Sequence, residues 1–319
     1  MRAAVPTDLS VVFEEHRSFL WGLSYRLTGS AADAEDVVQE TFVRVLERPP
    51  PRTDQPWRPW LVRVALNLGR DLLRHRRRRG YVGPWLPSPI ETGDAATLPG
   101  VEARLASGET TEGRYDMLES VSFAFLLALE ALTPRQRAVL LLRDVFDYSV
   151  RETAEALDVS EPTVKTTHHR ARRAMRAYEG RRVLPTRERQ AQVREVTERF
   201  LAALLAGDAR AVEALLVDSA VALTDGGGEF LAARRPVSGA DKVARFYVGL
   251  TRWRLAASTQ IEFRSLNGVP AIVLHTGGGQ DRLAPLVVTH LDLDREGRVA
   301  AIHSVLASGK LTALRRSAA

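Results

Sequence analysis

A three-residue turn between two predicted helices constrains this chain more than any other feature of its sequence. Residues 151–157 have helical spacing, residues 158–160 form the turn, and a second helix begins at Glu161. Asp158 stands at the turn position where glycine is common, and aspartate tolerates the left-handed backbone better than most residues. The segment therefore predicts a helix-turn-helix.

The second helix of this motif carries polar side chains in its first turns and arginines farther along. The start of a recognition helix enters the major groove, where Lys165 can donate to guanine, and arginines such as Arg172 suit phosphates. The alternative is a solvated surface helix. The residues predicted to contact DNA are Glu161, Thr163, Lys165, Thr166, His169, Arg170 and Arg173.

Charge is unevenly distributed along the 319 residues, whose formal net charge is +6. Residues 44–79 hold eleven arginines against three acids, and residues 163–182 hold seven basic residues against one acid. Residues 86–134, between them, hold eight acids against two arginines. Two basic blocks separated by an acidic stretch suggest two attachment points on a polyanion. A solvated, arginine-rich surface is the alternative.

Several classes of protein are excluded by composition. The chain has no cysteine, which excludes disulfides, cysteine-based zinc sites and thiol catalysis. No apolar run approaches the ~18 residues of a membrane span, and residues 1–10 lack the apolar region of a signal peptide. We expect a cytoplasmic protein without a cofactor, a metal or a membrane partner.

Residues 10–79 predict three helices. Gly29 fits the stop of the first helix, and Ser30 fits the N-cap of the second, which ends before the prolines at 49–51. The third helix carries an aromatic ring, arginines and an amide at spacings of three or four, which suit unstacked single-stranded bases. Core packing is the alternative for Trp60. This candidate face contains Trp60, Arg63, Asn67, Arg70 and Arg74.

The second predicted helix has an acidic face that would repel DNA. We therefore expect its partner to be a basic protein surface, while a solvated face is the alternative. The candidate residues are Asp33, Glu35, Asp36, Gln39, Glu40 and the neighbouring Phe42.

Beyond these helices, Thr133-Pro134-Arg135-Gln136 has the sequence of a capping box. From about residue 190 the pattern changes. Residues 193–216 predict two helices broken near Gly207, and strands are predicted at 271–275, 286–294 and 299–306. Two helices followed by a curved antiparallel sheet predict an α+β cone with a central pocket. The fold class is therefore multi-domain: two all-α domains, then the cone.

In order along the chain, three segments resemble those of extracytoplasmic-function sigma factors. Residues 33–42 resemble the helix that binds core RNA polymerase, residues 60–67 the segment that melts and traps −10 bases, and residues 133–176 the −35 domain. The resemblance implies core RNA polymerase, through its β′ clamp, and promoter DNA as partners. The implied domains are 1–80 and 116–182, joined by a linker at 81–115.

Residues 190–319 resemble the SnoaL-like domain appended in one subgroup of this family. The subgroup's motifs correspond to Trp85-Leu86-Pro87 in the linker, to Asp225-Gly226-Gly227 and to Lys310-Leu311, while Ser88 and Glu229 depart from its charges. The resemblance implies an intramolecular regulatory contact between the appended domain and the sigma domains. The sequence leaves open whether this domain activates or inhibits.

Two other functions remain open at this level. SnoaL-like cones can host enzymes or bind an unknown small molecule, and Asp225, His275, His290 and His303 could line such a pocket. The three glycines that follow Asp225 favour a turn, which is the alternative to a place in the pocket for this residue. An ordinary helix-turn-helix repressor is the other alternative, but it leaves the acidic helix and the Trp60 face unexplained.

Overall fold

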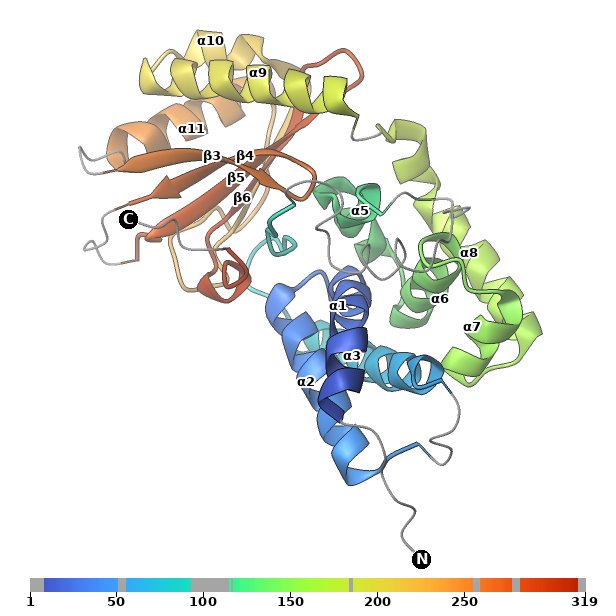
Figure 1. Ribbon diagram of the computed structural model, residues 1–319. Helices are drawn as coiled ribbons and strands as arrows, with labels where there is room; N and C mark the ends of the chain where they lie inside the picture. Colours follow the sequence, from blue (N-terminus) through green and yellow to red (C-terminus); the bar gives the residue numbers. More distant parts are fainter. Residues whose placement is uncertain are drawn as a thin grey trace, which may run out of the picture. The chain divides into compact units, whose positions relative to one another are not determined.

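The computed structural model describes residues 9–50, 56–92, 115, 117–183, 186–254, 259–276 and 282–314 (Figure 1). Contacts divide the chain into two compact units. The first contains residues 1–79, 94–121 and 125–179, and the second contains residues 80–93, 122–124 and 180–319. Residues 81–92 of the predicted linker thus pack with the C-terminal part of the chain.

The first unit is helical throughout its described residues. Its local starts and stops confirm the sequence predictions, since Gly29 has φ 69° and Ser30 Oγ accepts a hydrogen bond from Asp33 N at 3.2 Å. The helices are α1 (Leu9–Thr28), α2 (Ala31–Glu47), α3 (Arg58–Arg79), η2 (Glu119–Val121), α5 (Phe123–Ala128), η3 (Leu129–Ala131), α6 (Pro134–Asp144), α7 (Val150–Leu157) and α8 (Glu161–Arg181).

Close packing of α1 on α3 organises the N-terminal half of this unit. Leu23 and Leu61 are fully buried. A Cβ on Gly69 would lie 2.5 Å from Leu27 Cδ2, so α3 approaches α1 at a position where a side chain does not fit without displacing that leucine. This packing orients α2 and α3 in one rigid arrangement.

The C-terminal half of the first unit contains the predicted helix-turn-helix. Thr133 and Gln136 form the capping box of α6, which confirms that prediction. Asp158 ends α7 with φ 52°, the left-handed conformation expected of the turn. Val164 in α8 is fully buried, so the second helix of the motif is held in place by its inward face.

The second unit is an α+β fold in which helices pack on one face of a six-stranded sheet (Figure 1). The break between its first two helices confirms the prediction at Gly207. The strand order is β2-β1-β6-β5-β4-β3. The elements are α9 (Arg187–Leu205), α10 (Ala209–Ala214), β1 (Leu216–Asp225), β2 (Val237–Ser238), α11 (Ala240–Arg254), β3 (Gln260–Leu266), β4 (Val269–His275), β5 (Leu286–Leu293), β6 (Val299–Val305) and η4 (Ser308–Lys310).

One prediction about this unit is wrong, and one helix was not predicted. The sheet is mixed, because β1 and β6 pair in parallel, for example at Ala222 and Ile302. No hairpin joins two strands so distant in sequence, so local turn signals could not reveal their pairing. Helix α11 was not predicted, since its aromatic and β-branched residues favour strands and Gly249, which lies inside the helix, has a low helix propensity.

Candidate functional site

The acidic face of α2 is exposed in the structure. Asp36, Gln39 and Glu40 are exposed, and Asp33 and Glu35 are partly buried. The Phe42 ring packs edge-on against Phe13, with ring centroids 4.8 Å apart. Val43 and Leu46 were not predicted as surface residues, although they are 44% and 69% exposed beside these acids. An acidic surface with exposed apolar side chains suits a partner that is basic and partly apolar.

Helix α3 presents most of its predicted DNA-contacting residues to solvent. Arg63, Asn67 and Arg74 are exposed, and Trp60 is half-buried. Arg70 differs from the prediction: it is 8% exposed, and its Nη1 donates to Asn67 Oδ1 at 3.3 Å. Burial lowers the pKa of Arg70, and its position supports Asn67 instead of facing outward.

Helix α8 keeps its apolar and polar sides apart. Val164, Ala171 and Met175 lie on one side and are buried against the rest of the first unit. The predicted DNA-contacting residues lie on the remaining surface, with Thr163 half-buried. Those that are exposed are Glu161, Lys165, Thr166, His169, Arg170 and Arg173.

A buried carboxylate fixes the rotation of α8. Asp144 is 1% exposed and is bound by His168 Nε2 at 2.9 Å and by Arg172 Nη2 at 2.5 Å. Burial by itself would raise the pKa of Asp144, but the hydrogen bonds from His168 and Arg172 together hold it below its usual range. The guanidinium of Arg172 is thus held by Asp144, although the Arg172 side chain remains 43% exposed, and its contact with phosphate stays a prediction.

The two halves of the first unit contact each other through arginines. Arg63 Nη2 on α3 donates to the backbone oxygen of Glu155 on α7 at 2.8 Å. Arg137 on α6 is 1% exposed and donates to the carbonyl oxygen of Leu27 at 2.9 Å, and to Glu130 at 2.7 Å. Burial lowers the pKa of Arg137 to about 10, so the guanidinium stays charged at neutral pH.

In the second unit, Asp225 is the centre of a buried polar cluster. Its carboxylate accepts hydrogen bonds from the Tyr81 hydroxyl at 2.6 Å, from Leu86 N at 2.8 Å and from Gly227 N at 3.1 Å. The Lys310 ammonium binds both this carboxylate and the Leu86 carbonyl oxygen. The predicted regulatory residues thus meet, and Tyr81 joins them although the sequence analysis did not select it. We call these five residues the Asp225 cluster.

The surroundings of this cluster explain its glycines and one departure from the subgroup pattern. A Cβ on Gly226 would lie 2.8 Å from Ala232 Cβ, so a side chain there does not fit. Glu229 accepts a hydrogen bond from Ser308 N at 3.3 Å, within the second unit. The Lys310 ammonium lies 4.2 Å from the Trp85 ring centroid. Pro87 and Leu311 are buried nearby.

The segment after Leu86 continues along the edge of the sheet. Ile90 and Asn267 exchange hydrogen bonds of 3.0 Å, and Thr92 N donates to the Ser265 carbonyl oxygen at 3.1 Å. Glu91 forms an ion pair with Arg264. Asn267 lies in the turn between β3 and β4, and no local sequence signal identifies the contact of its side chain with Ile90. Residues 81–92 are therefore anchored at both ends within the second unit.

The residues weighed for catalysis do not converge on the main cavity of the second unit. Thr289 and Ser304 line the cavity. His290 and His303 are their neighbours along the strands, so their side chains lie on the other face of the sheet. Burial lowers the pKa of His290 to about 3, so it is neutral. His275 lies 3.5 Å from Glu262, and Asp225 belongs to its own cluster. Among the described residues, these four thus form no common catalytic site.

Comparison with known proteins agrees with this arrangement. Residues 12–79 match sigma-70 region 2, and residues 122–175 match sigma-70 region 4. The chain is 38% identical to the ECF RNA polymerase sigma factor SigJ of Mycobacterium tuberculosis over 242 residues, which are 75% of this chain and 72% of that protein. It is 27% identical over 314 residues to the probable ECF RNA polymerase sigma factor SigI of the same organism, covering 96% of each.

The similarity extends to the whole fold. The crystal structure of the extracytoplasmic function sigma factor SigJ of M. tuberculosis aligns with a TM-score of 0.69 and 30% identity, covering 96% of this chain and 99% of that chain. In the described part of this chain, no helix combines the length and apolar character needed to cross a membrane. Sigma regions 2 and 4, with an α+β unit after them, thus share one polypeptide. The chain belongs to the extracytoplasmic-function (ECF) RNA polymerase sigma factors.

Proposed function

We propose that this sigma factor binds core RNA polymerase through the acidic face of α2, and places α3 and α8 on two separate promoter elements. The separation of charge carries the proposal: α2 exposes acids such as Asp36, whereas α3 and α8 expose arginines and a lysine. Acids favour a basic surface of the polymerase clamp, and the two basic helices favour DNA. The cytoplasm is the compartment that this activity implies.

Replacing Asp36 with arginine is expected to weaken binding to core RNA polymerase at least about tenfold, which corresponds to about 1.4 kcal/mol. Asp36 is exposed on α2, so the change reverses a surface charge without disturbing packing. Binding is measured by titrating labelled core enzyme, and run-off transcription over a promoter library is measured in parallel.

A matched control places the same charge change elsewhere. Glu213 is exposed on α10 in the second unit, so Glu213→Arg is expected to leave core binding unchanged. If both variants bound core enzyme equally well, α2 would not be the docking face. Run-off transcription unaffected by the wild-type protein would contradict the proposed function as a whole.

On DNA, Lys165→Ala and Arg173→Ala are expected to behave differently. Lys165 is exposed near the start of α8, so its loss should relax sequence preference at one −35 position by about 1–3 kcal/mol. Arg173 lies farther along α8, so its loss should weaken binding to all DNA sequences evenly. It should also reduce the slope of log affinity against log salt concentration by about 1. Competition binding at several salt concentrations distinguishes them. Arg187→Ala is the control, because Arg187 is exposed on α9 in the second unit. Identical behaviour of the two α8 variants would contradict the proposed orientation of α8 on DNA.

We further propose that the second unit regulates the sigma regions in cis through residues 81–92. These residues connect α3 to the second half of the first unit along the chain, and the Asp225 cluster holds them. A domain tethered to the sigma regions is present at an effective concentration of about millimolar. Even weak contacts of this domain can therefore control whether region 2 and region 4 move apart.

Movement of the two regions is also required by the promoter itself. Elements at −10 and −35 lie about 25 base pairs apart, or about 85 Å at 3.4 Å per base pair. In the structure the two regions are in direct contact, since Arg63 on α3 donates to Glu155 on α7 at 2.8 Å and Arg137 on α6 donates to Leu27 on α1 at 2.9 Å. We therefore propose that this closed arrangement opens when the polymerase and the promoter are bound.

A further inference from the structure

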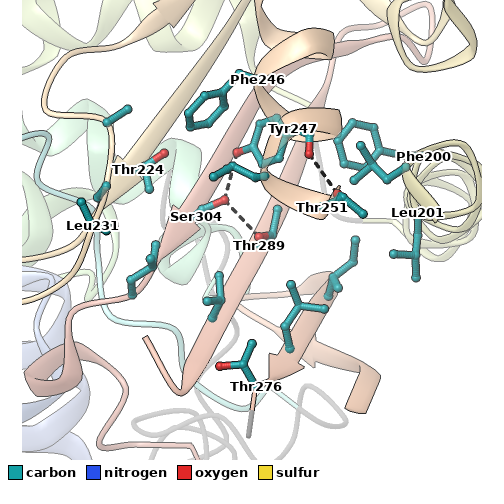
Figure 2. Close-up of a pocket in the computed structure, with 18 residues that line it drawn as sticks. Phe200, Leu201, Thr224, Leu231, Phe246, Tyr247, Thr251, Thr276, Thr289 and Ser304 are labelled. Carbon is teal, nitrogen blue, oxygen red and sulfur yellow. Dashed lines mark hydrogen bonds between the residues drawn. The ribbon is translucent and has the colours of Figure 1, made fainter. Parts of the chain in front are cut away.

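The second unit encloses a cavity that the proposed function does not use. Its volume is about 360 Å³, within the size range of small-molecule pockets. Figure 2 shows residues of α9 and α11 facing residues of the sheet across it, with Phe200 and Leu201 on the α9 side. Leu231, at 41% exposed, belongs to the lining, so the cavity reaches the surface.

The lining is apolar apart from hydroxyl groups, and none of the described residues that form it is charged. Phenylalanine, leucine, isoleucine, valine and alanine make most of the wall. An ionised ligand would lose its hydration without gaining an opposite charge, which costs several kcal/mol. The cavity therefore selects against acids and amines.

Three hydroxyls at the sheet side form a short chain of hydrogen bonds. Tyr247 Oη lies 2.9 Å from Ser304 Oγ, which lies 3.0 Å from Thr289 Oγ1 (Figure 2). Three hydroxyls carry three protons, and the two bonds between them use two. One of the three hydroxyls thus keeps a proton that it can donate to a ligand. Burial raises the pKa of Tyr247, which keeps its hydroxyl protonated.

A fourth hydroxyl lies on the same lining. Thr224 is 5% exposed, and its Oγ1 has no hydrogen-bond partner among the described residues. A buried polar atom without a partner costs about 1–3 kcal/mol, which a ligand or an ordered water molecule can offset. The cavity thus offers hydrogen bonds from two positions in an apolar wall.

We propose that this cavity binds an uncharged, mainly apolar small molecule that carries one or two hydrogen-bonding oxygen atoms. The apolar wall supplies affinity by removing carbon surface from water, and the hydroxyls orient the oxygen atoms. The ligand class is that of mainly apolar, neutral ketones, esters and alcohols.

The position of Thr224 links this site to the Asp225 cluster. Thr224 lines the cavity and directly precedes Asp225, whose backbone oxygen accepts a hydrogen bond from Leu306 N at 2.8 Å. Leu306 also lines the cavity. A bound ligand therefore orders both strand ends that hold residues 81–92, and becomes a regulatory input if the proposed regulation in cis is correct.

The experiment uses two dyes that share a skeleton and differ in charge. The neutral probe is N-phenyl-1-naphthylamine, and its charged counterpart is 8-anilino-1-naphthalenesulfonate. The full chain is titrated with each, with excitation where tryptophan does not absorb. We expect one neutral dye per chain, and at least about tenfold weaker binding of the sulfonate. Equal affinities, or no binding of the neutral dye, would overturn the proposal.

Two variants test whether the dye occupies this cavity. Leu201→Trp on α9 and Leu274→Trp on β4 enlarge side chains that line the cavity from the helix side and from the sheet side. Each should weaken binding of the neutral dye at least about tenfold. Leu205→Trp is the matched control, because Leu205 is 55% exposed on the same helix and is not part of the lining. Wild-type affinity in both cavity variants would overturn the assignment, and the second guards against misfolding of the first.

A pair of competitors tests the hydroxyls. 1-Acetylnaphthalene and 1-ethylnaphthalene have nearly the same shape, but the ketone alone accepts hydrogen bonds. Each competitor's affinity is measured on the wild type and on a double variant that combines Thr224→Val with Ser304→Ala. The preference for the ketone over the hydrocarbon should be about threefold to tenfold larger in the wild type than in the double variant. An unchanged ratio would overturn the role of the hydroxyls.

Hydrogen exchange then tests whether binding in the cavity affects residues 81–92. Saturation with the neutral dye should slow amide exchange in residues 81–92, whereas Leu205→Trp without dye should not. Unchanged exchange at full occupancy would overturn the coupling. None of these measurements involves polymerase or DNA, so failure here is separate from failure of the proposed sigma activity.

Discussion

Lys310→Met is expected to destabilise the second unit by about 3–5 kcal/mol, because it leaves the buried carboxylate of Asp225 without its counter-charge. The side chains of Lys310 and Asp225 are 9% and 0% exposed, so water cannot replace the lost partner. Hydrogen exchange of β1 and β6, which flank the cluster, measures the effect. Exchange in residues 81–92 should rise as well, since Lys310 also binds the Leu86 carbonyl oxygen.

Two further variants make this prediction specific. Lys242→Met removes an exposed lysine from α11 and should change stability by less than about 0.5 kcal/mol. Combining Asp225→Asn with Lys310→Met removes both charges, so the double variant should be more stable than the sum of the single changes predicts. Strict additivity would show that the two charges do not interact. With core enzyme, transcription by Lys310→Met should differ from wild type at least about threefold if the second unit regulates.

Arg137→Met is expected to open the first unit and to cost about 3–5 kcal/mol. Arg137 is buried and bridges the end of α1 to α6, so its loss removes the donor to the Leu27 carbonyl oxygen and leaves Glu130 with Arg76 as its remaining partner among the described residues. Methionine keeps most of the side-chain volume, so the effect reports the hydrogen bonds and the charge. Chemical unfolding followed by helical circular dichroism measures the stability.

The absence of cysteine makes the opening directly measurable. Spin labels on Val11→Cys and Ala174→Cys, both at exposed positions, report the distance between α1 and α8. Arg137→Met should lengthen and broaden this distance distribution. Arg135→Met is the control, because Arg135 is exposed on the same helix. An unchanged distribution together with unchanged stability would contradict the proposed closure by Arg137.

Local signals in the sequence were sufficient for much of the first unit. Ser30 caps α2, Thr133 caps α6, and Asp158 adopts the left-handed turn, because each depends on the residue itself and on its immediate neighbours. Helical spacing likewise placed Lys165 and Arg173 on the exposed side of α8. These features are set within one or two helical turns, where intrinsic preferences act.

Local patterns did not reveal the contacts that a distant partner decides. Arg172 has the spacing of a phosphate-binding residue, and no local signal shows that Asp144, on another helix, binds it at 2.5 Å. Arg70 shares the predicted face of α3, yet it is buried. Helix α11 has residues that favour strands, but packing on the sheet overrides that preference.

Local sequence patterns were enough to predict the three N-terminal helices, the helix-turn-helix, the separation of acidic from basic surfaces and the motifs that identify the family. Only the tertiary structure brought Leu86, Asp225 and Lys310 into one cluster, paired β1 with β6 in parallel and enclosed a cavity without charged walls. Helix caps and periodicity arise from neighbouring residues, whereas the Asp225 cluster joins residues that are 85 to 224 positions apart. Their meeting depends on how the entire chain buries its apolar surface.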